Sequence, residues 1–428
     1  MDAAHDVVFQ PHTTDVVAVE LAKHARLAMS SVKRPGNRAA AIDMTVARKT
    51  YLLRGAVLSE RHFQHGVAQD LWLEHAALVR GVQRAESLRR AAIATHQCGR
   101  PLGAEPLLKR ALVCFRRAGD LHGEGAVLGN LAGVFRDTGR IELAEQTYRQ
   151  ELTAHRRELH RDREGITLGN LAGVYRELGR AELAERNLME ALEIHREVGN
   201  RRFEGIELSN LAGIHMDAGR IGQAERGYRD ALKIHRELGN RRGEGVTLGN
   251  LAVLCQETGQ IEMAEGLYAE AISLHREVGN RRFEGIELGN LAGAYQVTGR
   301  PALAETSCRE ALAIHRETGN RRSEGVALGG LAGVYSITQR FELAERTYWE
   351  AISIHREVRN SRFEGVHLCG LATLLLGRLQ VGEAEKLWRQ GSSLLQKIGD
   401  LRTLGKLSGR LEEACTKAGV PPFHDHGR

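Results

Sequence analysis

A fixed period of forty residues runs through most of this 428-residue chain. Seven successive repeats carry a Glu-Gly step, a Leu-Ala step and an Ala-Glu step at constant spacing. The Glu-Gly steps begin at Glu124, Glu164, Glu204, Glu244, Glu284, Glu324 and Glu364. A period of this length indicates that each repeat is one supersecondary element that cannot bury its apolar face alone. Stacked repeats bury a continuous core, so we predict a solenoid whose function is surface recognition.

Each repeat contains two runs of apolar residues at helical spacing. Within residues 164–200 the first run ends at Gly179 and the second at Gly199. Glycine just beyond the last periodic residue is typical of a left-handed helix stop. Small residues such as Ala172 and Ala184 allow two helices to approach closely. We therefore predict that each repeat folds as a helix, a short turn and a second helix.

The order of residues within a repeat resembles the tetratricopeptide repeat. The resemblance rests on Leu171-Ala172, Tyr175, Gly179, Ala184, Leu188 and Ala191-Leu192. The usual repeat has about 34 residues and ends its second helix with proline. Here Arg196 stands at that place and the period becomes forty. This long variant resembles the repeats of Pins-like G-protein signalling modulators and kinesin light chains.

The resemblance covers roughly residues 84–419 and implies an all-α fold, a right-handed superhelical solenoid of helix-turn-helix repeats. It also implies a non-enzymatic scaffold that binds a peptide or protein partner in its concave groove. An alternative stays open, in which the protein is a peptide-responsive regulator whose N-terminal segment acts as the effector.

The period divides the chain into four segments. Residues 1–83 break it and form an irregular segment with helical patterns at Asp15–Val32 and Ala39–Val82. This segment is either a set of degenerate helical hairpins or a small effector module. Residues 84–398 contain eight helix pairs, the first of them atypical, as terminal repeats usually are. Residues 399–419 are predicted to be a capping helix, and residues 420–428 a disordered tail.

The predicted first helices carry glycine every four residues, as at Gly165, Gly169 and Gly173. An interior helical glycine costs about 1 kcal/mol relative to alanine, so these positions need a geometric reason. The resemblance places this face on the concave groove. Two explanations stay open: crowding of the inner wall, or close approach of a bound segment to the helix backbone.

An asparagine column stands beside the glycines, at Asn130, Asn170, Asn210, Asn250 and Asn290. Asparagine is a poor helix former, so its recurrence in the middle of a helix needs a reason. Its amide supplies both donors and an acceptor. The column is therefore expected either to hold the backbone of an extended partner or to form a ladder between adjacent repeats.

One turn further along lies the variable column, which is defined by the pair of positions that changes most between repeats. Its leading members are Arg136, Arg176, Met216, Gln256 and Gln296. Charged residues give way to apolar ones toward the C-terminus, where the second position of the pair becomes Val297 and Ile337. This gradient predicts a partner with one polar and one apolar end, unless the column is a solvated face that has drifted.

Metal and catalytic sites are not expected. Histidine recurs once per repeat, from His155 to His355, but neighbouring repeats stack at about 10 Å. Zinc needs nitrogen ligands at about 2.0–2.1 Å, so two members of this histidine column cannot share an ion. The sequence has no phosphate-binding loop, nucleophile elbow or His-Glu-x-x-His motif. We therefore expect no enzyme activity and no cofactor.

The remaining composition argues against several classes of partner. The net charge of +6 is spread thinly along the repeats, so a nucleic-acid partner is not expected. Arginine pairs in the turns, such as Arg201-Arg202, have glutamates nearby and are predicted to be salt-bridged. No apolar run is long enough for a membrane span. The six cysteines lack metal or disulfide spacing, which is typical of free thiols in the cytoplasm.

Overall fold

The computed structural model describes residues 38–61 and 64–423. These residues form 19 helices and no strand, so the predicted all-α architecture is confirmed for them. None of these helices is both long and apolar enough to cross a membrane. The helical pattern predicted at Asp15–Val32 and the last residues of the predicted disordered tail, 424–428, lie outside the described residues.

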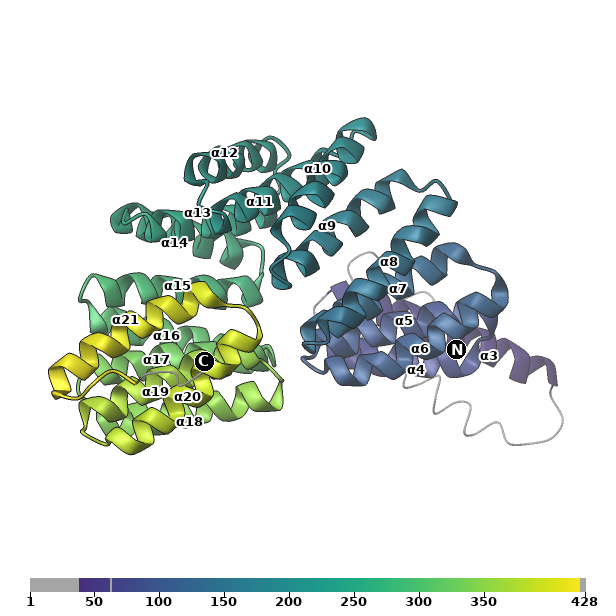
Figure 1. The fold of residues 1–428 in the computed structure, drawn as a ribbon. Helices are drawn as coiled ribbons and strands as arrows, with labels where there is room; N and C mark the ends of the chain where they lie inside the picture. Colours follow the sequence, from purple (N-terminus) through teal and green to yellow (C-terminus); the bar gives the residue numbers. More distant parts are fainter. Residues whose placement is uncertain (1–37, 62–63, 424–428) are drawn as a thin grey trace. The chain divides into compact units, whose positions relative to one another are not determined.

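Two N-terminal helices precede eight helix pairs and a final helix (Figure 1). The N-terminal helices are α3 (Arg38–Arg61) and α4 (His65–Leu78). The pairs are α5 (Gly81–Gln97) and α6 (Pro101–Ala118), α7 (Leu121–Asp137) and α8 (Ile141–Arg157), α9 (Arg161–Glu177) and α10 (Ala181–Glu197), α11 (Arg201–Asp217) and α12 (Ile221–Glu237), α13 (Arg241–Glu257) and α14 (Ile261–Glu277), α15 (Arg281–Val297) and α16 (Pro301–Glu317), α17 (Arg321–Ile337) and α18 (Phe341–Glu357), α19 (Ser361–Gly377) and α20 (Val381–Lys397). The final helix is α21 (Leu401–Ala418).

Local sequence explains where the helices stop and start. Gly179 and Gly199 have φ angles of 70° and 69°, in the left-handed region that ends a helix. The following Asn200 accepts a hydrogen bond from the backbone N–H of Phe203 and caps α11. Leu159 adopts φ of 56° although it is not glycine, and Gln339, Arg359 and Leu379 do the same at the equivalent place in other turns.

The helices form two compact parts. The N-terminal part runs to His160 and contains α3 to α8, and the C-terminal part starts at Arg161 and contains α9 to α21. The forty-residue period continues through this boundary, so the period alone did not predict it.

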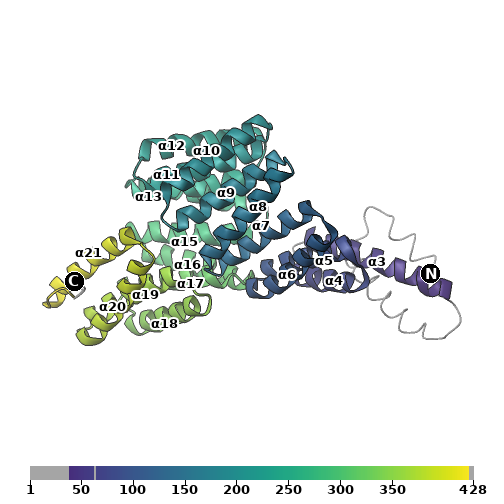
Figure 2. The same cartoon turned by 45° about the vertical axis from the view of Figure 1, so that its right-hand side comes forward.

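In the C-terminal part, the first helices of successive repeats pack directly against one another, and each second helix packs mainly against the first helices that flank it (Figure 2). The first helices therefore line the inner side of this stack. One continuous hydrophobic cluster runs from Ala212 to Cys415 through the C-terminal part. A smaller cluster joins α3, α4 and α5 around Leu52 and Trp72 in the N-terminal part.

In six repeats, a buried histidine of the second helix lies against the glycine of the Glu-Gly step; in the last repeat Leu395 takes the place of the histidine beside Gly365. A Cβ atom on Gly165 would stand 2.7 Å from Cε1 of His195, and one on Gly245 would stand 2.7 Å from Cε1 of His275. Both rings have no exposed surface. Burial lowers the pKa of His275 to about 4, so this ring is neutral at neutral pH. These glycines are required by crowding inside the repeat.

A different crowding acts on the second glycine of the predicted stripe. A Cβ on Gly169 would stand 2.2 Å from Oε1 of Glu207, which belongs to the first helix of the next repeat. Gly249 and Glu287 are related in the same way, at 2.3 Å. The stripe therefore does not form a single groove-facing surface, because its members face different neighbouring helices.

The glutamate of the Glu-Gly step forms a second constant contact. Glu204 is 5% exposed and accepts hydrogen bonds from Arg196 at 2.8 Å and from Arg201 at 2.5 Å. Arg201 also reaches Glu237 of the next second helix. Equivalent bonds surround Glu244, Glu284 and Glu324. These ion pairs confirm that the arginine-rich turns are salt-bridged.

Candidate functional site

The variable column lies at the C-terminal ends of the first helices. In the C-terminal part it begins with an ion pair between repeats: Nε of Arg176 on α9 donates to Oδ2 of Asp217 on α11 at 2.5 Å. Met216 is 9% exposed and belongs to the hydrophobic core. The accessible chemistry of the second member of this column therefore comes from Asp217 rather than from Met216.

The next two members are glutamines with specific partners. Oη of Tyr268 on α14 donates to Oε1 of Gln256 at 3.0 Å, within the same repeat. Nε2 of Gln296 donates to the backbone carbonyl oxygen of Gly330 on α17 at 3.3 Å. These bonds fix the two amides at the ends of α13 and α15.

The C-terminal end of the variable column is apolar and accessible. Val297 is 65% exposed and Ile337 is 54% exposed. When a partner covers exposed apolar side chains, the free energy of the complex falls by about 25 cal/mol per Å² of apolar surface buried. The polar-to-apolar gradient seen in the sequence thus lies on accessible side chains of the C-terminal part.

The asparagine column makes two kinds of contact. Asn210 and Asn290 donate to the carboxylates of Glu207 and Glu287 on their own helices, at 2.9 and 3.1 Å. Asn250 instead donates to Oγ of Ser209 on the preceding first helix, at 3.4 Å.

In the N-terminal part, Asn130 accepts a hydrogen bond from Arg89 of α5 at 3.2 Å. Asp137, beside Arg136 at the end of α7, pairs with His96 of α5 at 2.8 Å. In the C-terminal part, three members of the asparagine column therefore make hydrogen bonds to their own helix or to the preceding repeat. In the N-terminal part, Asn130 makes such a bond to the preceding repeat.

The final helix reaches the variable column. Arg402 of α21 donates to Oε2 of Glu257 at 2.8 Å, and Nζ of Lys406 lies 3.7 Å from Oε1 of the same carboxylate. Glu257 is the residue next to Gln256 at the end of α13. The capping helix thus contacts a member of the candidate surface that lies far from it in sequence.

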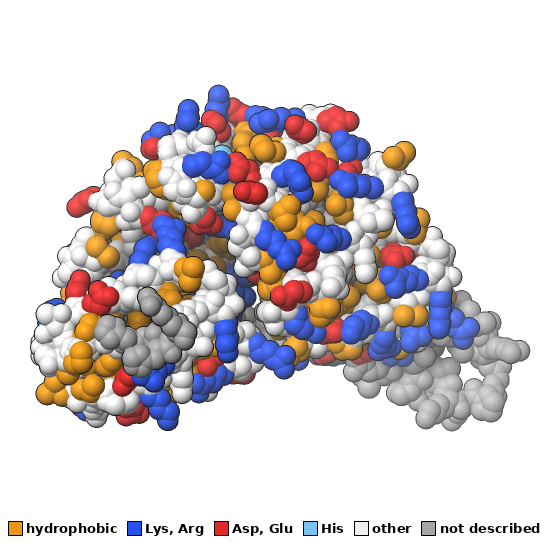
Figure 3. Space-filling model, viewed as in Figure 1, with side chains coloured by type: hydrophobic (Ala, Val, Ile, Leu, Met, Phe, Trp, Pro, Cys, Tyr) orange, Lys and Arg blue, Asp and Glu red, His pale blue; other side chains and the backbone are white. Residues whose placement is uncertain are grey.

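Charge is distributed evenly on the surface that contains these elements. Figure 3 shows basic and acidic side chains interspersed over the visible face of the described residues. Many of these charged side chains form ion pairs, some within one helix and others between repeats. This distribution agrees with the thin spread of net charge along the sequence.

The sequence matches known repeats across most of the periodic region. A tetratricopeptide repeat model matches residues 83–157, 206–277 and 286–357, which is more than half of the chain. A second tetratricopeptide repeat model matches residues 166–198. The chain therefore belongs to the tetratricopeptide repeat family.

Solved structures with the same fold are found at low sequence identity. A Rap protein complexed with competence and sporulation factor has a TM-score of 0.58 at 13% identity, over 82% of this chain and 99% of that one. The Rap conjugation gene regulator of plasmid pLS20, complexed with the Phr* peptide, has a TM-score of 0.58 at 11% identity, over 90% and 96%.

A third structure is a signal-transduction ATPase with a tetratricopeptide repeat sensor from Pyrococcus horikoshii. It has a TM-score of 0.51 at 14% identity, over 97% of this chain and 65% of that one. No curated protein matches the sequence significantly. The fold comparisons confirm the predicted tetratricopeptide solenoid, an architecture that serves in general as a scaffold for protein interaction.

Proposed function

We propose that the protein binds a peptide or protein partner along the inner side of the C-terminal part, over the ends of α9 to α17. The observation that carries this proposal is the variable column. Its residues change from Arg176 and Asp217 to Val297 and Ile337 while the surrounding contacts repeat. A surface of this kind selects a partner by side chain, with a polar end and an apolar end.

The asparagine column has a secondary role in this proposal. An asparagine amide that already donates to Glu207 or Glu287 keeps its carbonyl oxygen as an acceptor for a partner's backbone N–H. Each such bond contributes about 0.5–1.5 kcal/mol net to binding. Backbone contacts of this type add affinity without selecting the partner's side chains.

The experiment is selection of linear peptides from a random displayed library on the full-length chain, followed by affinity measurement on variants. Replacing Val297 and Ile337 with Ser should weaken the selected peptides at least tenfold, because apolar burial is lost. Replacing Gln296 with Ala should change which peptides are selected. Replacing Asn170, Asn210 and Asn250 together with Ala should weaken all selected peptides by about 1.5–4.5 kcal/mol.

The matched controls are exposed apolar residues of the second helices. Met189 on α10 is 48% exposed and Trp349 on α18 is 37% exposed. Their replacement with Ser should leave peptide affinity unchanged. The proposal is wrong if these controls abolish binding while the variable-column variants retain it. A triple asparagine variant that binds normally but melts well below the parent would make that column an inter-repeat ladder.

A second candidate function is a peptide-responsive regulator with an N-terminal effector. It is favoured by the separate hydrophobic cluster of α3, α4 and α5 around Leu52 and Trp72. It is also favoured by the two Rap structures, one complexed with competence and sporulation factor and the other with the Phr* peptide. In this case a selected peptide should alter hydrogen exchange in α3 and α4. Unchanged exchange in those helices at saturating peptide would exclude it.

A further inference from the structure

We propose that His122, Glu158 and His160 form a binding site for a divalent transition-metal ion, zinc foremost, in the N-terminal part. This site is independent of the proposed partner surface. It also differs from the histidine column, whose members are separated by a whole repeat. The sequence-based expectation of no metal site rested on the histidine column, to which His122 and His160 do not belong.

All three residues stand where the chain departs from its own repeat. His122 takes a position that is arginine in six repeats, from Arg202 to Arg402. His160 replaces the turn residue that is Asn or Asp in every other repeat, as at Asn200. Glu158 replaces a residue that is apolar or threonine elsewhere, as at Val198. Three independent exceptions thus fall on positions that the fold brings together.

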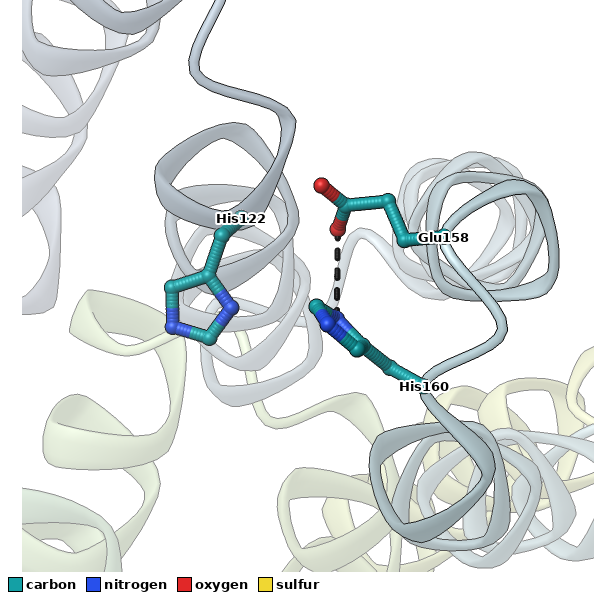
Figure 4. Close-up of side chains that lie close together, drawn as sticks. All are labelled: His122, Glu158 and His160. Atoms are coloured by element: carbon teal, nitrogen blue, oxygen red, sulfur yellow. Dashed lines mark ion pairs between the residues drawn. The ribbon is translucent and has the colours of Figure 1, made fainter.

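The geometry gathers three ligand atoms at one place (Figure 4). One atom from each side chain can be chosen so that all lie within 4.8 Å of one another. Oε2 of Glu158 lies 3.3 Å from Nδ1 of His160. The rings of His122 and His160 meet edge to face, with centroids 5.5 Å apart. Glu158 and His160 flank Leu159 in the turn after α8, and their side chains lie beside His122 of α7.

The burial pattern suits a site that an ion enters from solvent. Oε2 of Glu158 is buried and makes no hydrogen bond within the described residues. The side chain of His160 is 42% exposed and that of Glu158 is 19% exposed. A buried carboxylate oxygen without a hydrogen bond is costly, and a bound cation would satisfy it. His122 is exposed and free to rotate toward the pair.

Two imidazoles and one carboxylate are a donor set that zinc accepts, with water in the fourth position. In a tetrahedral zinc site with bonds of about 2.0–2.1 Å, ligand atoms lie about 3.3 Å apart. The Glu158–His160 separation already has this value. Only His122 has to move closer, and rotation of one exposed side chain achieves this.

The histidine column does not meet these conditions. His195, for example, is fully buried and lies against Gly165 and Phe203 rather than against a second ligand. His215 does pair with a carboxylate, Glu185, at 3.3 Å, but no second histidine joins it. Within the described residues, His122, Glu158 and His160 are the only such group of three.

The test is titration of the full-length chain with ZnCl2 by calorimetry in a buffer that does not chelate zinc. We expect one zinc ion per chain and a rise in melting temperature on binding. The informative variants are His160→Asn and His122→Arg, because each restores the residue that other repeats use and so preserves the fold. Each should weaken zinc binding at least tenfold. Glu158→Gln should weaken it as well.

The matched control is His215→Ala, which removes a half-buried histidine paired with glutamate and should leave zinc affinity unchanged. A second control is the double variant His424→Ala, His426→Ala, in the tail outside the described residues. The proposal is overturned if the parent binds no zinc at about 100 micromolar. A site with a Kd of about 1 micromolar would be almost fully occupied at that concentration. It is equally overturned if zinc binding survives His160→Asn and disappears in the tail variant.

Discussion

The contact inside a repeat and the contact between successive repeats follow different rules. Inside six of the repeats, a buried histidine lies against glycine, as His275 does against Gly245. Between successive first helices the contacting residue changes, from Glu207 to Thr247, Glu287, Ala327 and His367. The internal contact sets the packing of the helix pair, so it is constant. The contact between repeats only has to fit its neighbour, so it can vary.

That fit is visible as size complementarity. The large residues Glu207, Glu287 and His367 each lie against a glycine of the preceding repeat. Gly289, by contrast, has nothing within 4 Å of its Cβ position, and the equivalent residue of the next repeat is Ala327. Neighbouring repeats are therefore matched in pairs, whereas the interior of each repeat is self-sufficient.

The largest expected effect is a pH-dependent change in stability that comes from the contact between successive first helices. Burial raises the pKa of Glu207 and Glu287 to about 7, above the ordinary value of 4.5. The folded chain holds these protons more tightly than the unfolded chain, so their stabilisation is complete below about pH 4.5 and is lost as pH rises to about 7. At pH 8, Glu207→Gln with Glu287→Gln should stabilise the fold by up to about 3 kcal/mol per carboxyl.

Urea unfolding of parent and double variant from pH 4 to pH 8 measures this difference. The buried histidines, such as His275 with its pKa lowered to about 4, titrate in the opposite sense. They are present in both proteins and cancel in the difference. Glu262→Gln, at an exposed position of α14, is the matched control and should show no pH-dependent gain. A constant difference across the pH range would show that the two carboxyls are hydrated.

A smaller effect, a loss of folding stability, is expected from overpacking the histidine–glycine contact inside a repeat. In Gly245→Ala the new methyl group would stand 2.7 Å from Cε1 of His275, and a rigid, fully buried ring cannot yield. Overpacking of this kind costs about 1–3 kcal/mol. Thermal or urea unfolding measures the loss, and adding His275→Ala should make the alanine at position 245 tolerable. Equal costs in the presence and absence of the ring would contradict this account.

The smallest effect has the opposite sign and sharpens the same comparison. Gly289 lies inside α15 with open space at its Cβ position. Gly289→Ala should therefore stabilise the fold by about 1 kcal/mol through helix propensity alone. The measurement is the urea midpoint beside that of Gly245→Ala. If both substitutions destabilise the fold equally, the contact between successive first helices is as tightly packed as the histidine–glycine contact inside a repeat.

The helical architecture could be predicted from the sequence because it depends on local signals. The period, the glycine stops and the apolar spacing fix where each helix begins and ends, and Gly179 and Gly199 adopt the expected left-handed conformation. The salt-bridged turns also followed from local residues, since Arg201 and Glu204 are three positions apart on one helix. Such features need no knowledge of long-range packing.

Other features depend on which helices meet, and the sequence alone did not reveal them. The glycines at 165 and 169 look equivalent along one helix face, yet one meets the second helix of its own repeat and the other meets the next repeat. The burial of Glu207 and the division at His160 and Arg161 are of the same kind. The cluster of His122, Glu158 and His160 was detectable as a set of exceptions to the repeat.

The pairing of large residues with glycine has a genetic consequence. Near-identical forty-residue segments invite recombination that removes or duplicates a repeat, and most of the contacts would accept the new neighbour. A deletion of residues 205–244, however, would place Thr247 opposite Gly169 in place of Glu207. Loss of two successive repeats, residues 205–284, would instead bring Glu287 to Gly169 and restore the match. Copy number in this segment is thus expected to change more readily by two repeats than by one.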